Sequence, residues 1–190
     1  MTAGDYLIVC FIPNAEGVPH MALGMIKPIT VIESSAPVAA LPEAKVSIDM
    51  VDLGFGLSGA ISAGLQNISV TNKREQEHEA FLIWLAPNAT AMVFVGAFAP
   101  DAPPGPPSGE ALGGFQSIAP GGGGTFNVNV TPGNYVFLCF VEDLNTGAPH
   151  FALDMLEEFR IQYSVERSCL SGRCTIAMKS PRKTRGLLYG

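Results

Sequence analysis

The sequence predicts an all-β protein, built as a Greek-key β-sandwich with a short helix and a long loop rich in proline and glycine. Its 21 glycines and 15 prolines in 190 residues favour turns and short strands over long helices. A hydrophobic content of 47% with only 15% charged residues indicates a folded core rather than disorder. Several apolar segments are short and alternate with polar residues at the period of two that is typical of a half-buried strand.

The N-terminal segment, residues 1–32, is predicted to form only two strands. An apolar strand ends at Cys10, a loop with two prolines follows, and a second strand covers residues 26–32. Two strands cannot bury a core of their own. Residues 33–45, which are rich in serine and proline, are predicted to be a linker.

A larger unit, residues 46–165, is predicted to hold the complete sandwich. Strands are expected at residues 46–51, 59–63, 66–71, 81–85, 125–130, 135–140 and 159–165. Residues 89–98 are predicted to include one or two helical turns, with Asn88 as the N-cap after Pro87. Residues 99–124 contain many prolines and a run of four glycines, which predicts a long surface loop without strands.

The most informative feature of the chain is a motif that it contains twice. Residues 4–11 read GDYLIVCF and residues 133–140 read GNYVFLCF, and each copy continues with a glycine, a proline directly followed by a histidine, and then a methionine. Nine or ten residues separate cysteine from histidine, and four separate histidine from methionine. The repeated residues are Cys10, His20 and Met25 in the first copy and Cys139, His150 and Met155 in the second.

A thiolate, an imidazole and a thioether on one short loop are most of the ligand set of a mononuclear copper site. The chain has only three histidines, and two of them occupy the same place in the two copies. The third, His78, is therefore the candidate for the missing ligand. Asp154 precedes Met155 where the first copy has Gly24, which predicts an altered loop at that point.

The charge distribution excludes one class of partner. Residues 1–159 carry 4 basic and 16 acidic side chains, a net charge of −12, whereas residues 160–190 carry 7 basic and 1 acidic, a net charge of +6. The acidic body argues against nucleic-acid binding.

The sequence has neither an apolar run long enough for a membrane span nor the pattern of a signal peptide. The basic tail, residues 166–190, is predicted to be disordered.

The order of these motifs resembles the cupredoxins, which carry cysteine, histidine and methionine copper ligands on their final hairpin and a further histidine shortly after an asparagine on an earlier strand edge. Here the final hairpin carries Cys139, His150 and Met155, and His78 follows Asn72. The long loop, with proline directly before histidine, looks most like the type 1 copper loop of copper nitrite reductases. The resemblance covers about residues 46–161.

The resemblance implies one type 1 copper per complete domain, held by His78, Cys139, His150 and Met155. It implies one-electron transfer with an unidentified redox partner protein, and a periplasmic, secreted or cell-envelope location. Residues 1–32 match the last two strands of another such domain, so we interpret them as a domain truncated at its N-terminus.

The first copy of the motif would then hold an incomplete second site of Cys10, His20 and Met25. Its free sheet edge also makes strand exchange with another chain through residues 4–32 a prediction.

Catalysis is not expected. Multicopper oxidases and copper nitrite reductases place a histidine directly before the cysteine to connect a second copper centre, whereas this chain has Leu138 there, and Val9 in the first copy. Two alternatives to an electron carrier remain open from the sequence. One is a copper-free cupredoxin fold that acts as a binding or cell-envelope structural module, and the other is a copper storage or delivery protein that uses the same ligands.

Overall fold

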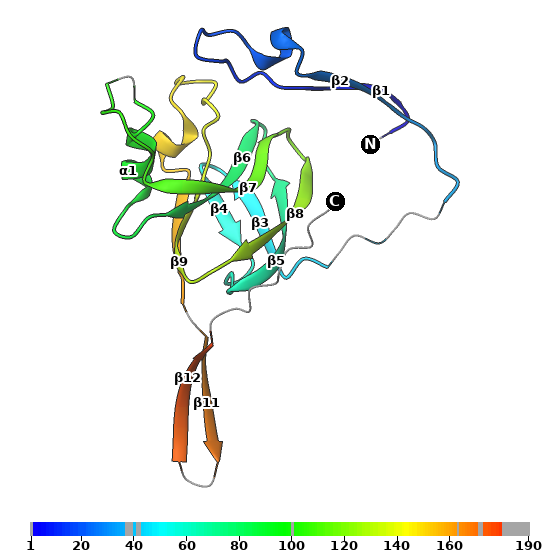
Figure 1. The fold of residues 1–190 in the computed structure, drawn as a ribbon. Coiled ribbons are helices and arrows are strands. Elements are labelled where there is room, and N and C mark those ends of the chain that lie inside the picture. The colour runs from blue at the N-terminus through cyan, green and yellow to red at the C-terminus, as the bar shows by residue number, and fades with distance from the viewer. Residues whose placement is uncertain are drawn as a thin grey trace. The chain divides into compact units, whose positions relative to one another are not determined.

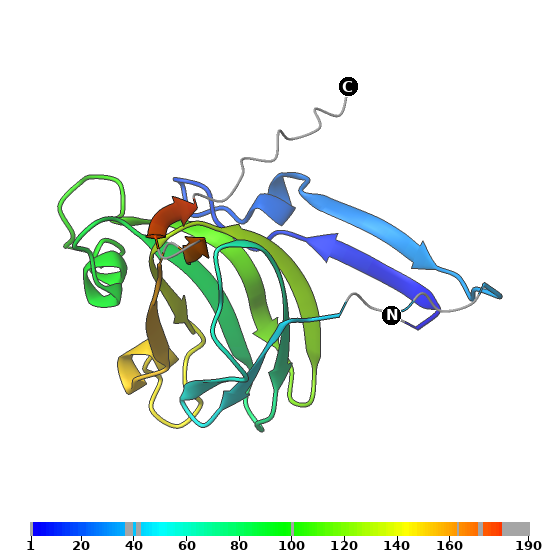
Figure 2. The same ribbon diagram turned by 90° about the horizontal axis from the view of Figure 1, so that it is seen from below.

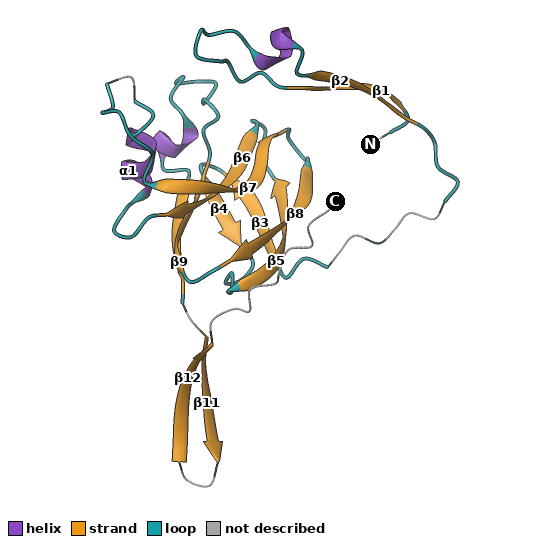
Figure 3. Ribbon diagram, viewed as in Figure 1, coloured by secondary structure: helices purple, strands orange, loops and turns teal. Residues whose placement is uncertain are grey.

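A computed structural model describes residues 2–36, 40, 43–99, 101–162, 164–170 and 173–179, and gives side chains as far as residue 162. Strands account for most of the regular structure (Figure 3). The chain divides into two compact units, Met1–Leu41 and Pro42–Gly190. No helix among the described residues has the length and apolar character needed to cross a membrane.

The first unit is a hairpin. Strand β1 (Gly4–Val9) pairs antiparallel with β2 (Ile26–Val31), and the loop between them contains the 3-10 helix η1 (His20–Leu23). The two predicted strands are therefore present, and η1 is an addition. Among the described residues, β1 pairs with β2 alone, and the predicted strand exchange through residues 4–32 stays a prediction.

The second unit contains a sandwich of two four-stranded sheets, drawn from cyan to orange in Figure 1 and from below in Figure 2. One sheet has the order β4-β3-β5-β8, and the other has the order β10-β9-β6-β7. The strands are β3 (Val46–Val51), β4 (Gly54–Leu57), β5 (Gly64–Asn72), β6 (His78–Leu85), β7 (Gly109–Ile118), β8 (Gly123–Val130), β9 (Gly133–Leu138) and β10 (Leu156–Ile161). Neighbouring strands are antiparallel except for β3 and β5, which are parallel. This confirms the predicted all-β sandwich.

The core between the sheets follows from the alternation of side chains along each strand. Ile48 in β3, Ile68 in β5, and Leu82 and Phe137 from the opposite sheet are fully buried in one cluster. Burial of each such side chain stabilises the fold by about 1.5–3 kcal/mol.

The sheet that carries β6 and β9 is covered on both faces. On its outer face, Ile83, Val136 and Leu138 pack against Phe94 of helix α1 (Ala91–Gly96). This explains why β6 and β9 contain continuous apolar runs instead of alternating ones.

The predicted helix is present, but its start is corrected. Thr90 is the N-cap, because its hydroxyl accepts a hydrogen bond from the backbone N–H of Val93 at 3.3 Å. The carboxylate of Glu158 accepts a further bond from the N–H of Ala91 at 2.6 Å. Asn88 instead adopts a left-handed conformation with φ of 67° in the preceding turn, a conformation that asparagine tolerates better than most residues.

The predicted strandless loop of residues 99–124 is wrong for its second half, where β7 forms and β8 begins. Sequence reasoning missed β7 because its glycines resemble loop punctuation. Gly114, with φ of 115°, lies where an added Cβ would be 2.0 Å from the carbonyl oxygen of Ala80 in β6. Glycine is needed here because the two backbones approach closely at an irregularity in the strand register.

Two other boundaries differ from expectation. The strand expected at residues 59–63 is absent, and β4 forms earlier because a tight turn at Leu53, with φ of 50°, folds the chain back onto β3. In the tail, residues 164–170 and 173–179 form the antiparallel strands β11 (Ser164–Leu170) and β12 (Arg173–Lys179). The predicted disorder of residues 166–190 therefore does not hold for residues 166–170 and 173–179, which pair as strands. Residues 180–190 lie outside the described residues.

Candidate metal centre

Pairing of β6 with β9 brings the candidate ligands together from distant parts of the sequence. His78 is the first residue of β6, and Cys139 directly follows the last residue of β9. The register places Phe81 opposite Leu138, so the two ligands lie at the same end of the paired strands. His150 begins the 3-10 helix η2 (His150–Leu153) in the loop that returns from Cys139 to β10.

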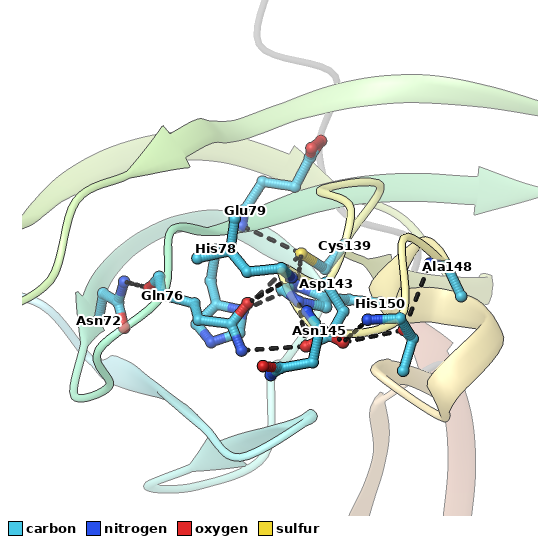
Figure 4. A network of polar contacts seen from close by, with 11 residues as sticks. Asn72, Gln76, His78, Glu79, Cys139, Asp143, Asn145, Ala148 and His150 are labelled. Atoms are coloured by element: carbon cyan, nitrogen blue, oxygen red, sulfur yellow. Dashed lines mark hydrogen bonds and ion pairs between the residues drawn. The ribbon is translucent and has the colours of Figure 1, made fainter.

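Three donor atoms converge at this end of the sandwich, as Figure 4 shows. The Nδ1 atoms of His78 and His150 are 3.1 Å apart, and the Cys139 Sγ is 3.3 Å from the His150 Nδ1 and 4.0 Å from the His78 Nδ1. All three residues are buried. Two bonds of about 2.0–2.3 Å to a shared ion would span separations of this size, so the three donors fit a single metal.

The loop that carries Cys139, His150 and Met155 is held by its own backbone. The N–H of His150 donates to the carbonyl of Val141 at 2.8 Å, and the N–H of Phe151 donates to the carbonyl of Cys139 at 2.9 Å. The backbone N–H of Met155 donates to the carbonyl of His150 at 2.9 Å, and the carbonyl of Met155 accepts a bond from the N–H of Cys139 at 3.3 Å. The side chain of Met155 is fully buried at the same end of the core.

The altered loop expected from Asp154 is not found. Asp154 and its counterpart Gly24 both adopt the left-handed conformation, with φ of 72° and 98°. Both follow a four-residue 3-10 helix that begins at the histidine. Aspartate tolerates this conformation at moderate cost, so the substitution changes the residue without changing the backbone path to Met155.

The cysteine sulfur accepts a hydrogen bond from the backbone of the neighbouring strand. The N–H of Glu79 lies 3.3 Å from Cys139 Sγ. Burial raises the pKa of the Cys139 thiol to about 11, and hydrogen bonds from the backbone of Glu79 and Val141 oppose that shift. Burial also lowers the pKa of His78 and of His150. The histidines are therefore neutral near pH 7, which is the state that binds metals.

A polar network outside the three donors fixes the loop to the segment before β6. Asp143 accepts a hydrogen bond from the Gln76 side-chain amide at 3.0 Å, and the Gln76 carbonyl oxygen of the side chain accepts from the Leu144 N–H at 3.0 Å. Asn72 donates to the main-chain carbonyl of Gln76 at 2.7 Å. Side-chain bonds from Gln76 and Thr146 lower the pKa of Asp143 to about 2, so this carboxylate is ionised.

His150 has one ring nitrogen that supports the metal interpretation. Its buried Nε2 makes no hydrogen bond and lies 4.0 Å from the Asp143 carboxylate. If Nδ1 uses its lone pair for a metal, Nε2 carries the proton and faces a negative charge, an arrangement that commonly orients histidine ligands. Sequence reasoning did not identify Asp143 or Gln76. The repeat could have drawn attention to Asp143, because it lies four residues after Cys139, where the first copy has the polar residue Asn14 four residues after Cys10.

The first copy of the motif reproduces only part of this site. Cys10 Sγ lies 3.6 Å from His20 Nδ1, and Met25 follows on the same loop with a side chain that is 59% exposed. His20 is the sole histidine in residues 1–41 of the sequence, so this unit has no counterpart of His78. The incomplete second site of Cys10, His20 and Met25 stays a prediction.

Comparisons with known proteins give structural likeness only. No family model matches the chain, and no curated protein matches it. The chain is similar to the dithionite-reduced auracyanin of the photosynthetic bacterium Roseiflexus castenholzii, with 21% identity and a TM-score of 0.42 over 61% of this chain and 94% of that one. It is also similar to auracyanin B, with 17% identity and a TM-score of 0.42 over 67% of this chain and 95% of that one.

The family resemblance rests on the molecule's own features. A sandwich of two four-stranded sheets carries His78 at the start of one strand and Cys139, His150 and Met155 on its last hairpin. The order of the candidate ligands along the chain and the convergence of the first three fit the resemblance to cupredoxins that the sequence motifs indicated.

Proposed function

We propose that this protein binds one copper ion in its sandwich and transfers single electrons through it. The observation that carries the proposal is the convergence of two imidazole Nδ1 atoms and one thiol sulfur within 3.1–4.0 Å of one another in a buried site. Sulfur and imidazole ligands together favour copper, and a weak axial thioether is typical of blue-copper electron-transfer sites. The buried Met155 would supply the thioether to a bound copper.

The chain's own groups limit how far the ligands can move. His150 and Met155 are joined by a backbone hydrogen bond in one tight loop. The sulfur of Cys139 accepts a hydrogen bond from the backbone N–H of Glu79 in β6. When bound, copper would supply the one-electron couple. Ligands that are already in place reorganise little between two oxidation states, which favours fast electron transfer over chemistry on a substrate.

Aromatic side chains separate the ligand loop from solvent on one side. Phe140 packs edge-on against Phe81 and Phe151, with ring centroids 6.3 and 5.3 Å away. An apolar surrounding of this kind excludes water from a thiolate and helps to set the potential of a bound metal. The side chains that follow Cys139 and His150 directly in the sequence thus protect the site.

We place the approach of a redox partner on the other side, where His78 lines a surface cavity. The cavity has a volume of about 720 Å³, and its charged lining comprises Asp52, Glu75, Asp143, Lys73 and Arg74. The exposed Leu144 lies on its rim. A partner with a basic surface would suit the net charge of −12 that residues 1–159 carry, since complementary charge accelerates association. We also propose an exported location and a role without catalysis of its own.

The test is to add Cu(II) to the purified chain and to record visible absorption and electron paramagnetic resonance. We expect an intense thiolate-to-copper band with narrow hyperfine splitting. Cys139→Ser should lose both signals, and Cys10→Ser should keep them because Cys10 belongs to the other unit. Thermal melts of both apo variants show whether each is folded.

Other outcomes would contradict the proposal. A colourless protein that still binds Cu(I) through Cys139 would indicate storage or delivery. A folded protein that binds copper in neither oxidation state would indicate a metal-free binding or structural module. A band that survives Cys139→Ser would place the coloured centre elsewhere.

A further inference from the structure

We propose that Cys10, His20 and Met25 form a second metal site, open to solvent, that takes Cu(I). This site is separate from the buried one, because the three residues belong to the first unit of the chain. The ligand class follows from the donors: thiolate and thioether sulfur are soft ligands that select Cu(I), and imidazole suits copper in either oxidation state.

Three backbone hydrogen bonds that hold this loop have direct counterparts in the loop of the buried site. The backbone N–H of Cys10 donates to the carbonyl of Met25 at 3.2 Å, and the N–H of Met25 donates to the carbonyl of His20 at 2.9 Å. The N–H of His20 donates to the carbonyl of Ile12 at 2.9 Å. The corresponding bonds of the second copy measure 3.3, 2.9 and 2.8 Å. The first copy also brings its thiol and imidazole together, because Cys10 Sγ lies 3.6 Å from His20 Nδ1, against 3.3 Å between Cys139 Sγ and His150 Nδ1.

The donor atoms are within reach of a metal from outside. A cavity of about 330 Å³ is lined by Cys10, Met25 and their neighbours Val9 and Gly24. Cys10 and His20 are half-buried, whereas the corresponding Cys139 and His150 are fully buried. An ion can therefore enter and leave this site without opening a core.

The absence of a second histidine in residues 1–41 decides the oxidation state. Three ligands, two of them sulfur, suit Cu(I), whereas Cu(II) prefers a tetragonal set of nitrogen and oxygen donors. The open site would thus be colourless and would hold copper without contributing the charge-transfer band expected of the buried site. Its open position would also let a donor from another molecule complete the coordination.

The experiment uses the full chain under anaerobic, reducing conditions, with Cu(I) titrated against a chromophoric Cu(I) chelator. Cys169 and Cys174 are first replaced by serine, because they are the other thiols of the sequence. In this background we expect two Cu(I) ions per chain, one after Cys10→Ser, one after Cys139→Ser, and none after both. If Cys10→Ser still binds as many ions as its parent, with the same affinity, the open site does not exist.

A single exposed thiol could bind Cu(I) without the other two ligands, so a second set of variants separates these cases. In the Cys139→Ser background, His20→Ala and Met25→Leu should each weaken Cu(I) binding at least tenfold. Unchanged affinity in both would mean that Cys10 acts alone, which overturns the three-ligand site.

An isolated two-stranded hairpin is marginally stable, and a metal that joins its two strands should order it. In the Cys139→Ser background, Cu(I) should therefore slow amide hydrogen exchange across Gly4–Val31. Adding Cys10→Ser should abolish that effect. Failure of the buried site would appear in a different place, as a Cys139→Ser variant that binds as much Cu(I) as its parent, so the two proposals are tested independently.

Discussion

Replacing Asn72 with alanine should destabilise the sandwich more than its position at the end of β5 suggests. Its side chain is fully buried, and its amide donates to the carbonyl oxygens of Gln76 at 2.7 Å and Ile118 at 2.8 Å. Its Oδ1 accepts from the N–H of Arg74 at 2.9 Å. One side chain thus joins β5, the segment that leads into β6, and the end of β7.

The cost can be worked from these three bonds. The Ile118 carbonyl lies in the interior and would lose its partner at about 1–3 kcal/mol, because water cannot replace a buried donor. The bonds to Gln76 and Arg74 are only partly buried, so each should contribute about 0.5–1.5 kcal/mol. Asn72→Ala should therefore reduce the free energy of unfolding by about 2–6 kcal/mol.

Urea unfolding followed by fluorescence of Trp84, the single tryptophan of the chain, measures this loss. With a urea m-value of about 1.5 kcal/mol/M, a loss of about 3 kcal/mol moves the midpoint by about 2 M. Asn127→Ala is the matched control, because Asn127 is exposed on β8, and it should change the free energy of unfolding by less than about 0.5 kcal/mol. A loss below about 1 kcal/mol for Asn72→Ala, at unchanged m-value, would refute the reasoning.

Two further substitutions test the packing and hydrogen bonding of the sandwich. Gly114→Ala should cost about 3–5 kcal/mol, because its Cβ would meet the Ala80 carbonyl oxygen at 2.0 Å. Gly113→Ala also has a positive φ but meets no atom within 4 Å, so it should cost only about 1–2 kcal/mol, and equal losses in urea unfolding would contradict the steric argument. Tyr135→Phe removes two hydrogen bonds. The tyrosine hydroxyl donates to the carbonyl of Thr131 at 2.7 Å and accepts from the N–H of Thr131 at 3.0 Å. It should lower the free energy of unfolding by about 1–2 kcal/mol, and a variant as stable as its parent would contradict this role.

The sequence was sufficient to predict the sandwich, and to select the three residues whose donor atoms converge in the structure, because both predictions depend on short-range patterns. Alternation along β3 and β5 indicated half-buried strands, and the repeated Cys-His-Met spacing identified the ligand loop. His78 was selected because it is the remaining histidine of the chain, and the structure places it beside Cys139. Its role as a copper ligand stays a proposal.

Features that depend on contacts between distant strands could not be predicted. Strand β7 is stabilised by pairing with β6, and its glycines serve that close approach instead of marking a loop. The bond from Gln76 to Asp143 joins residues 67 positions apart, and no local pattern connects two such residues. Thr90 displaced Asn88 as the N-cap because helix α1 starts where its apolar face meets the outer face of the sheet.

The two copies of the motif separate what a short sequence encodes from what a fold adds. Three backbone hydrogen bonds of the loop agree to within about 0.1 Å in the two units, so the segment from cysteine to methionine follows a similar backbone path in both. Burial and the second nitrogen donor come from β6 and the sandwich, which supply His78 in the second copy alone. The same loop should therefore give a rigid, closed site in one unit and an open one in the other, and the difference between an electron carrier and a metal-exchanging site would lie in the neighbouring strand and not in the loop.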